Sequence, residues 1–552
     1  MKNNIRIFLL VLALMCGISA LDAQRPGACQ VDKYLSLLQG KRVAVCANQT
    51  SLVDQTHLVD TLLSYQINVK KIFCPEHGFR GKAEAGAHIA SSTDPRTGLP
   101  IISLYGNNKK PLPEQMKDLD VVVFDLQDVG CRFYTYISTL HYVMEAAAEN
   151  HVQVVVLDRP NPNGYFVDGP VLEPKYRSFV GMHPVPVVYG MTIGEYAQMI
   201  NSEGWLANGA HCDLTVIPIA FYNHDTRYAL PVAPSPNLPT EESIYLYPSL
   251  CFFEGTNISI GRGTSTPFEI YGSPSFQEGD YTFTPKPIPG VSENPPCKNQ
   301  TCKGFQLTEI AKEGLRKGDN QLQLDYLLNA YRLCPNKENF FTNASFFDKL
   351  AGTDQLRKQI AAGKTAEEIR QSWKSGLDSF MLVRERYLLY SDFSKYEDYY
   401  IVKIDSTPRH YFIVLSKNKN DLNKNPEELP ILKHSRSDGG WYDIRVNTDF
   451  ENNITMPIII SPKIGVETPK VQVGDKYTMR LLKTNIEILD DSYEYIGLGE
   501  YLFSGNKCYF PKNWIDLNYA PEKNIQNKYH MQLMKLEKEL GAPVRGIRAP
   551  KE

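Results

Sequence analysis

The sequence of 552 residues predicts an α/β fold with three parts: a Rossmann-like, doubly wound parallel sheet domain, a smaller α+β domain and an appended β-rich C-terminal module. Three observations predict it. Short apolar runs alternate with helical patterns up to residue 158, an irregular stretch and further helical patterns follow, and tyrosine-rich strand patterns come after residue 395. At about 100–200 residues per domain, a chain of this length is expected to hold several domains.

Five continuous apolar runs predict the strands of the first domain, which we place at residues 30–190. They are RVAVCA, VKKIFC, IISLYG, DVVVFDL and VQVVVLD. Unbroken apolar strands separated by helices are typical of a parallel sheet that is buried on both faces. Between the last two runs, Ile137, Leu140, Met144 and Ala147 recur at three- and four-residue spacing, which predicts a helix that packs on the sheet.

The second domain is expected at residues 191–395. It begins with a helix at MTIGEYAQMI and a strand at DLTVIPIA, and a long irregular stretch over residues 229–281 follows. Long ordered loops of this kind usually serve a site. Thr192 and Glu195 form a TxxE capping box, which is expected to occupy the Glu195 carboxylate with backbone.

The third part, residues 396–552, contains the strand patterns YFIVLS, MPIIIS, YTMRLL and EYLFSGNKCYF between polar loops. Its length is that of a domain. The sequence predicts a separate β-rich module and assigns it no role.

The first residues predict export. Lys2 and Arg6 precede a short apolar run and small residues that end at Ala23, so residues 1–23 are interpreted as a signal peptide. No later stretch reaches the roughly 20 apolar residues of a transmembrane helix. We therefore expect a periplasmic or secreted protein without a transmembrane anchor.

Charge and cysteine content limit the partners and the chemistry. The net charge of -3 offers no basic field, so nucleic acid is not expected as a partner. Cys297 and Cys302 lie close together in PPCKNQTCKG, and an exported protein could join them in a local disulfide. Two unpaired surface thiols are the alternative, because sequence alone does not fix connectivity.

Polar side chains follow four of the predicted strands, where open parallel sheets bind their ligands. They are Asn48, Gln49 and Thr50; Glu76 and His77; Asp125, Gln127, Asp128 and Arg132; and Asp158, Arg159, Asn161 and Asn163. The turn after the first strand is ANQTSL rather than GxGxxG, so no dinucleotide and no other cofactor is expected. Walker, GxSxG and HExxH sequences are also absent.

Six segments in series resemble the exo-β-N-acetylmuramidase family of glycoside hydrolases. They are CPEHGFRG (74–81), DLQDVGCRFYTY (125–136), DRPNPNG (158–164), YGMTIGEYA (189–197), SPNLP (235–239) and FEGTNISIGRGT (253–264). The resemblance covers residues 30 to about 395. It implies two domains flanking a cleft that removes terminal β-1,4-linked N-acetylmuramic acid from peptidoglycan-derived disaccharides or glycan chain ends, in cell-wall recycling.

Glycoside hydrolysis usually needs two carboxyl groups. Glu76 is the candidate general acid, because it follows a buried strand and partial burial raises a carboxyl pKa toward the working pH. An ion pair with Arg80 is the structural alternative. Asp128, Asp125 and Glu254 are the candidates for the second carboxylate, although Asp125 could instead cap the next turn.

The resemblance implies a substrate with a lactyl carboxylate, for which a guanidinium is the natural bidentate partner. Arg132, Arg159 and Arg262 follow apolar strand patterns within the shared motifs. Tyr134 and Tyr136 could stack on a sugar, or one of them faces the core. The remaining candidates for substrate binding are Asn48, Arg80, Asn161, Asn163, Asn237 and Asn257.

Two other functions use the same cleft. Glu76, His77, Glu84 and His88 could serve a metal-assisted hydrolase, but their spacing is loose for zinc, so no metal is expected and His77 is interpreted as a hydrogen-bonding neighbour of Glu76. A muropeptide-binding protein without turnover is favoured if Glu76 turns away from the cleft.

Overall fold

The computed structural model describes residues 24–76, 78–79, 92–317 and 321–393, and segments of the chain between 396 and 509. The chain divides into two compact units, of which one is Gln24–Phe393 and the other includes Ser394–Glu552. The predicted signal peptide lies outside the described residues. None of the described helices is long and apolar enough to cross a membrane. The boundary near residue 190 stays a prediction.

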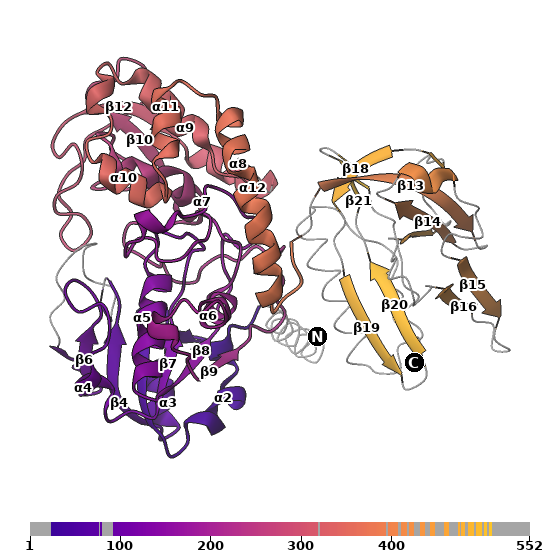
Figure 1. Cartoon of the computed structure of the whole chain (residues 1–552), viewed down its shortest axis with the longest axis horizontal. Coiled ribbons are helices and arrows are strands. Elements are labelled where there is room, and N and C mark those ends of the chain that lie inside the picture. The colour runs from indigo at the N-terminus through magenta and orange to yellow at the C-terminus, as the bar shows by residue number, and fades with distance from the viewer. Residues whose placement is uncertain are drawn as a thin grey trace, which may run out of the picture. The chain divides into compact units, whose positions relative to one another are not determined.

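A seven-stranded sheet forms the lower half of the first unit in Figure 1. In spatial order its strands are β5 (Ser92–Thr93), β6 (Pro100–Ser103), β4 (Asn68–Cys74), β1 (Arg42–Ala47), β7 (Val121–Asp125), β8 (Gln153–Leu157) and β9 (Leu214–Ile217). All neighbours pair in parallel except β5 and β6. The six parallel strands follow the doubly wound order, in which the connections reverse between β1 and β7. The predicted Rossmann-like α/β fold is confirmed.

The sheet is buried on both faces, because alternate side chains of β1 enter different hydrophobic clusters. Ala44 and Cys46 pack with α5 (Tyr136–Glu149) and α6 (Ile193–Ser202). Val43, Val45 and Ala47 pack on the other face, together with α2 (Val31–Leu38) and α3 (Leu58–Ser64). Unbroken apolar strands are stable only in such a two-sided core.

The helix patterns of the sequence hold in the structure. Ile137, Leu140, Met144 and Ala147 of α5 are fully buried, which confirms the predicted face. α6 begins at the predicted capping box, where the Thr192 amide donates to the Glu195 carboxylate at 2.9 Å. The short helix α4 (Pro113–Met116) and the hairpin of β2 (Leu52–Val53) and β3 (Thr56–His57) complete this half.

The second half is of α+β type, as predicted. A three-stranded antiparallel sheet has the order β10 (Ile270–Ser273), β12 (Cys302–Gln306) and β11 (Tyr281–Phe283). The helices around it are α7 (Glu241–Leu250), α8 (Thr308–Lys317), α9 (Leu324–Leu333), α10 (Ala344–Ala351), α11 (Gln355–Ala361) and α12 (Ala366–Arg384). The strand DLTVIPIA, expected in this second domain, is instead β9 of the large sheet, because it pairs in parallel with β8.

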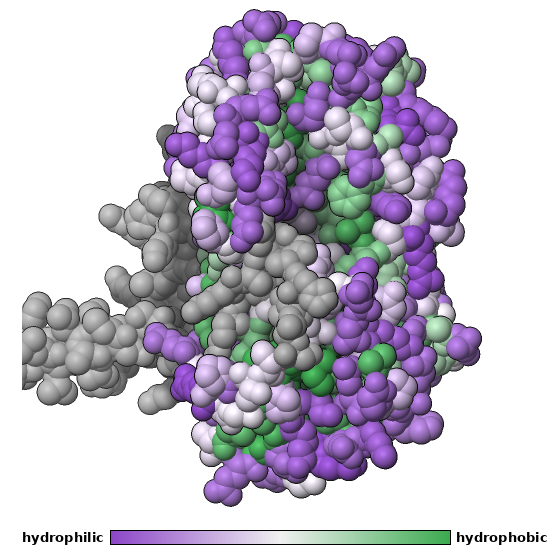
Figure 2. Space-filling model, turned by 90° about the vertical axis from the view of Figure 1, so that its left-hand side faces the viewer, coloured by the Kyte–Doolittle hydropathy of each residue, from purple (hydrophilic) through white to green (hydrophobic). Residues whose placement is uncertain are grey.

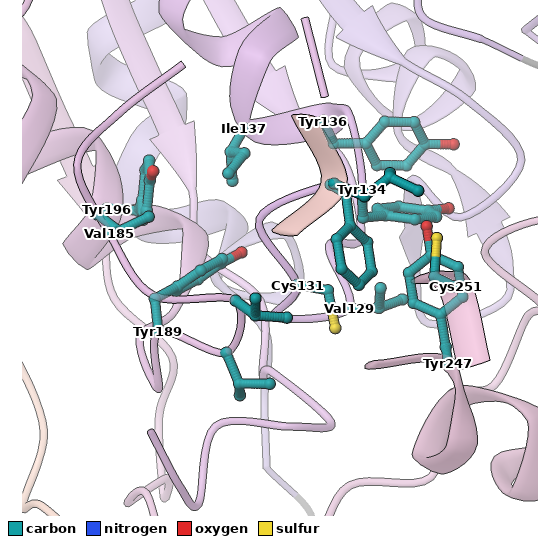
Figure 3. Packing of buried hydrophobic residues seen from close by; sticks show 14 of the residues in the cluster. Val129, Cys131, Tyr134, Tyr136, Ile137, Val185, Tyr189, Tyr196, Tyr247 and Cys251 are labelled. Atoms are coloured by element: carbon teal, nitrogen blue, oxygen red, sulfur yellow. The ribbon is translucent and has the colours of Figure 1, made fainter. Parts of the chain in front are cut away.

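Buried tyrosines fill the space between the sheet and the second half (Figure 3). Tyr134 meets Tyr136 edge to face at 4.7 Å between ring centroids, and Tyr247 of α7 at 5.9 Å. Tyr189 and Tyr196 pack at 4.8 Å. Such edge contacts add to the free energy gained by burying the rings, so both halves share one core.

The second unit is rich in β-structure, as predicted. Its largest sheet has the order β17 (Ile458–Pro462), β14 (His410–Ser416), β13 (Tyr396–Ser406) and β18 (Lys476–Arg480), all antiparallel. Three antiparallel pairs follow: β15 (Ile431–Arg436) with β16 (Tyr442–Asn447), β19 (Thr484–Asp490) with β20 (Tyr493–Gly499), and β21 (Leu502–Ser504) with β22 (Lys507–Tyr509).

Candidate active site

The fold brings the polar strand ends together. The strands β4, β1, β7 and β8 are neighbours and run parallel, so their carboxyl ends share one edge of the sheet. Glu76 follows β4 by two residues, and Asn48 follows β1 directly. Because the connections reverse between β1 and β7, ligands are expected at this edge. The surface of the unit is hollowed between its two halves (Figure 2).

Glu76 lies against the first turn of α5. Its side chain is partly buried, and Thr135, the N-cap residue of α5, donates its hydroxyl to Oε2 at 3.3 Å. The Thr135 hydroxyl makes no capping bond to the helix backbone. A helix N-terminus favours a nearby negative charge. The carboxylate of Glu76 is therefore held at the edge of the sheet.

Tyr105 joins Glu76 to a second carboxylate. It follows β6 and hydrogen bonds to the Glu76 side chain. Burial raises the pKa of the Tyr105 phenol, and so do the charge of Glu76, the hydrogen bond to it and the charge of Glu254. The hydroxyl of Tyr105 therefore stays protonated and lies within the field of both carboxylates.

Glu254 is fixed by an arginine. Arg262 donates from Nε at 3.2 Å and from Nη2 at 2.5 Å to its Oε1, and the Arg262 guanidinium lies 5.1 Å from the ring of Phe268. Burial opposes the charge of Arg262, but Glu254 outweighs it and raises the pKa of the guanidinium. The two side chains are 24% and 20% exposed, so Glu254 is partly open to solvent while paired.

Asp125 and Arg159 form a buried ion pair. The two side chains are 0% and 4% exposed, and the guanidinium meets the carboxylate at 2.6 and 2.9 Å. Arg159 also donates to the Leu52 carbonyl at 3.0 Å. Burial opposes the charge of Arg159, but the Asp125 carboxylate outweighs it and raises the pKa. The polar groups of both candidates are therefore taken up by contacts within the protein, and their roles at the site stay predictions.

Asp128 lies beneath the surface. Its Oδ2 accepts hydrogen bonds from the Gly130 amide at 2.7 Å and from the Tyr189 hydroxyl. Among the described residues, its buried Oδ1 has no hydrogen-bond partner. Burial raises the pKa of Asp128 to about 6, against the hydrogen bonds from Tyr189, Gly130 and Val129 that lower it. A carboxylate that solvent does not reach is a poor partner for water or for a sugar.

Arg132 crosses the core instead of reaching a ligand. It is fully buried and donates to the carbonyls of Pro170 at 2.8 Å, Val185 at 2.6 Å and Leu350 at 2.9 Å. Burial without a carboxylate partner lowers its pKa to about 9. Arg132 therefore ties α10 to the segment before α6, and its contact with substrate stays a prediction.

The two motif tyrosines face the interior. Tyr134 and Tyr136 are 7% and 1% exposed, and both hydroxyls donate to the Pro234 carbonyl, at 2.9 and 3.3 Å. Asn48 donates to the Tyr136 oxygen at 2.7 Å and is itself buried. Neither ring presents a face for stacking, so all three residues support the loop that carries Pro234.

The asparagines of the DRPNPNG motif also have structural partners. Asn161 donates to the Met191 carbonyl at 2.7 Å and accepts from the Asn163 amide at 2.8 Å. Asn163 donates to the carbonyls of Val129 and Ile244 at 2.9 and 3.2 Å. Both side chains are buried, and their contact with substrate stays a prediction.

Asn237 and Asn257 keep an unused acceptor. The Oδ1 atom of each is buried and has no hydrogen-bond partner among the described residues. Asn257 lines a cavity of about 420 Å³ together with Thr256, Ser273 and Cys297. A second cavity of about 300 Å³ opens beside Gln49, and Glu76 lines neither of them.

Two predicted site residues, His77 and Arg80, lie outside the described residues, as do Glu84 and His88 of the metal alternative. Within the described ranges, no group of three or more His, Cys, Asp or Glu side chains could hold a metal ion. Sequence reasoning missed Tyr105 and Thr135. Tyr105 ends the run IISLYG, so extending the strand-end argument to this fifth strand would have found it.

Comparison with known proteins covers both halves of the first unit. Residues 43–242 match the family model described as exo-β-N-acetylmuramidase NamZ, N-terminal, and residues 245–390 match the corresponding C-terminal model. The peptidoglycan β-N-acetylmuramidase NamZ of Bacillus subtilis is 42% identical over 381 residues, which cover 65% of this chain and 89% of that protein.

Solved structures agree. A DUF1343 family protein from Bacteroides fragilis is 46% identical with a TM-score of 0.62, and the match covers 67% of this chain and 99% of that one. Another DUF1343 family protein of the same organism is 29% identical with a TM-score of 0.55, over 67% and 100% of the two chains. By sequence and by fold, the chain belongs to the exo-β-N-acetylmuramidase NamZ family.

Proposed function

We propose that this chain is an exo-acting β-N-acetylmuramidase that hydrolyses terminal β-1,4-linked N-acetylmuramic acid from peptidoglycan fragments, with Glu76 as the general acid. The observation that carries the proposal is the membership of residues 43–390 in the NamZ family, whose curated relative acts on peptidoglycan. The position of Glu76 supports the choice of acid, because it follows a central strand at the edge where doubly wound sheets bind ligands.

Glu76 has neighbours that fix the direction of its side chain. Thr135 and Tyr105 both hydrogen bond to its side chain, so two hydroxyls restrict its rotamers. A general acid must point at the leaving oxygen to within hydrogen-bond reach. Held in this way, the carboxyl group gives its proton to the glycosidic oxygen as the bond to the muramic acid breaks.

Glu254 is the second carboxylate in this proposal. Of the three candidates, Asp125 is neutralised by Arg159 and Asp128 is buried, whereas Glu254 is 24% exposed. Its charge reaches Tyr105, the direct neighbour of Glu76. Glu254, paired with Arg262, is suited to act as base or nucleophile on the opposite side of the sugar.

The cellular setting is also part of the proposal. Lys2, Arg6 and the apolar run that follows favour export to the periplasm or secretion. Peptidoglycan-derived disaccharides or glycan chain ends would meet the enzyme there. An exo-acting muramidase in that compartment would serve cell-wall recycling.

The products of the purified full chain test the function. Incubated with the disaccharide in which N-acetylmuramic acid is β-1,4-linked to N-acetylglucosamine, it should release both free sugars, and longer glycans should shorten from one end only. Tight binding without turnover would instead support a muropeptide-binding protein. Activity that is lost to a chelator and restored by zinc would support the metal-assisted hydrolase.

A further inference from the structure

Three partly buried aromatic rings form a group, one of which, Tyr105, hydrogen bonds to Glu76. Phe179 stacks on Tyr142 of α5, with ring centroids 6.3 Å apart and planes 15° apart. Phe179 also meets Tyr105 at 6.4 Å, with planes tilted by 60°. Ser138 of α5 donates its hydroxyl to the Phe179 carbonyl at 2.7 Å, which fixes the loop that carries this ring. None of the three rings is fully buried.

A positive charge lies over one of these rings. The Lys109 ammonium is 4.6 Å from the centroid of Phe179, and within the described ranges no carboxylate pairs with it. The next residue differs, because Lys110 is held by Glu145 and Glu149 at 2.7 Å each. The ammonium of Lys109 is therefore available to an anion.

Arg177, two residues before Phe179 in the sequence, is a second positive charge. It is exposed, and no carboxylate among the described residues pairs with it. Burial lowers the pKa of His141 to about 4 against the charge of Glu145, and the charge of Arg177 lowers it further. The charge of Arg177 therefore reaches His141, whose ring meets that of Tyr142 at 5.5 Å between centroids.

We propose that Tyr105, Tyr142, Phe179 and Lys109 form a subsite for a sugar that carries a carboxylate, with the pyranose ring against the aromatic faces and the carboxylate on the Lys109 ammonium. The inference rests on the proposed function and deepens it. Aromatic faces bury the C–H face of a sugar, and an ammonium next to such a face binds a carboxylate through a charge-assisted hydrogen bond. Tyr105 links the subsite to the acid, because it contacts both Phe179 and Glu76.

This subsite takes the role that the sequence assigned to arginines. Arg132 and Arg159 are committed to carbonyls and to Asp125, and Arg262 is committed to Glu254. In a peptidoglycan fragment, a carboxylate next to the sugar has two sources: the free lactyl group of the muramic acid or the stem peptide attached to it. The same recognition chemistry serves both.

The test replaces Lys109 by Met, which keeps the length of the side chain and removes its charge. Initial rates are measured on the disaccharide with a free lactyl carboxylate, on its uncharged lactyl amide and on the disaccharide with a stem peptide. Lys109→Met should raise KM by about tenfold on a substrate that carries the recognised carboxylate, leave kcat within about twofold, and leave the uncharged amide unaffected. If KM rises only on the disaccharide with the free lactyl group, the lactyl carboxylate is the one recognised. If KM rises only on the disaccharide with a stem peptide, the peptide carboxylate is the one recognised.

Lys117→Met is the matched control, since Lys117 is an exposed lysine at the C-terminal end of α4. Equal KM values for the Lys109 and Lys117 variants on every substrate would overturn the subsite, and so would an equal rise on the charged and uncharged substrates. If the unaltered chain released no muramic acid at all, the proposed function would fail before the subsite was tested.

A second variant tests the ring. Phe179→Leu keeps an apolar side chain but loses the aromatic face, so it should raise KM on the charged and the uncharged substrates alike. The far-ultraviolet circular dichroism spectrum and the unfolding midpoint check that the chain is folded. A folded variant with unchanged KM would contradict the aromatic half of the proposal.

Discussion

The Tyr105 side chain hydrogen bonds to Glu76, and the same phenol lies in the field of Glu254. The two carboxylates come from distant parts of the chain, one after β4 and the other in the 3-10 helix Cys251–Gly255 that follows α7. A single hydroxyl therefore contacts the proposed acid and lies within the field of the proposed second carboxylate. Removing this hydroxyl should change the orientation of Glu76 without removing its charge.

Replacing the acid itself should abolish most of the activity. Glu76→Gln keeps the shape and the hydrogen bonds of the side chain but has no proton to give, so kcat on the natural disaccharide should fall by about 100-fold or more. The loss should be smaller on a nitrophenyl muramide, because nitrophenolate leaves with little protonation. Initial rates on both substrates check this.

Equal losses on the two substrates would show that Glu76 acts as base or nucleophile instead of acid. Unchanged rates on both would return the site to the metal-assisted or the binding-protein alternative. The fold should survive in either case, because Glu76 is only partly buried at the end of a strand.

Tyr105→Phe should act through Glu76. The ring remains, so the packing against Phe179 is kept, but the hydrogen bond to the carboxylate is lost. The loss of a hydrogen bond to a charged group corresponds to about a tenfold change. We therefore expect kcat to fall by that factor and KM to stay nearly unchanged. Tyr65→Phe is the control, since Tyr65 is 52% exposed. If KM rose while kcat held, the Tyr105 hydroxyl would bind substrate instead of positioning Glu76.

The buried pair of Asp125 and Arg159 should matter for stability. Asp125→Asn leaves the guanidinium without a countercharge in the core, which should lower the free energy of unfolding by about 3–5 kcal/mol. Lys374 and Asp378 provide the comparison, because these side chains are 61% and 65% exposed. Asp378→Asn should change the same free energy by less than about 0.5 kcal/mol. Denaturant unfolding measures both variants. Similar losses of unfolding free energy in the two would mean that burial does not set the strength of the Asp125–Arg159 pair.

The strands could be predicted from sequence because their apolar runs are unbroken, and α5 could be predicted because its buried positions repeat at helical spacing. The site was harder to predict. A polar residue at a strand end can turn outward to a ligand or back into the protein, and the choice depends on what packs above it. Asp125 turns to Arg159, and Arg132 turns to three carbonyls. The partners of Arg132 include Leu350, 218 residues away, and no local pattern carries that information.

Asp128 should make stability depend on pH. Its pKa is about 6 in the folded chain and has an ordinary value of 3.8, so folding favours the protonated form. The stabilisation is complete below about pH 4 and is lost as the pH rises through 6. It amounts to about 3 kcal/mol of unfolding free energy, because one pKa unit corresponds to about 1.4 kcal/mol. Asp128→Asn removes this titration. Denaturant unfolding at pH 4 and pH 8 compares the variant with the unaltered chain. The unfolding free energy of the variant, relative to that of the unaltered chain, should be higher at pH 8 than at pH 4. A constant difference would contradict the raised pKa.

Cys297 should be the most reactive of the described cysteines. The sequence leaves open a local disulfide with Cys302 or two unpaired thiols. Both are free cysteines in the structure, and their thiols hydrogen bond to each other. The hydrogen bond from Cys302 lowers the pKa of Cys297, against its burial, and the backbone of Ser259 lowers it further. Burial raises the pKa of Cys46 and Cys74 instead. Since the thiolate is the nucleophile, alkylation of Cys297 should begin at a lower pH than that of an ordinary thiol.

Peptide mass spectrometry after timed treatment with iodoacetamide measures this at each cysteine. Cys297 lines an open cavity, so the reagent can reach it. Cys302→Ala removes the donor and should shift the pH profile of alkylation at Cys297 upward, whereas Cys74→Ala, which is not in contact with the pair, should leave it in place. Because a lowered pKa increases the thiolate fraction only below the ordinary thiol pKa, the two profiles should converge at high pH. A profile that is unaltered by Cys302→Ala would show that the neighbouring thiol does not activate Cys297.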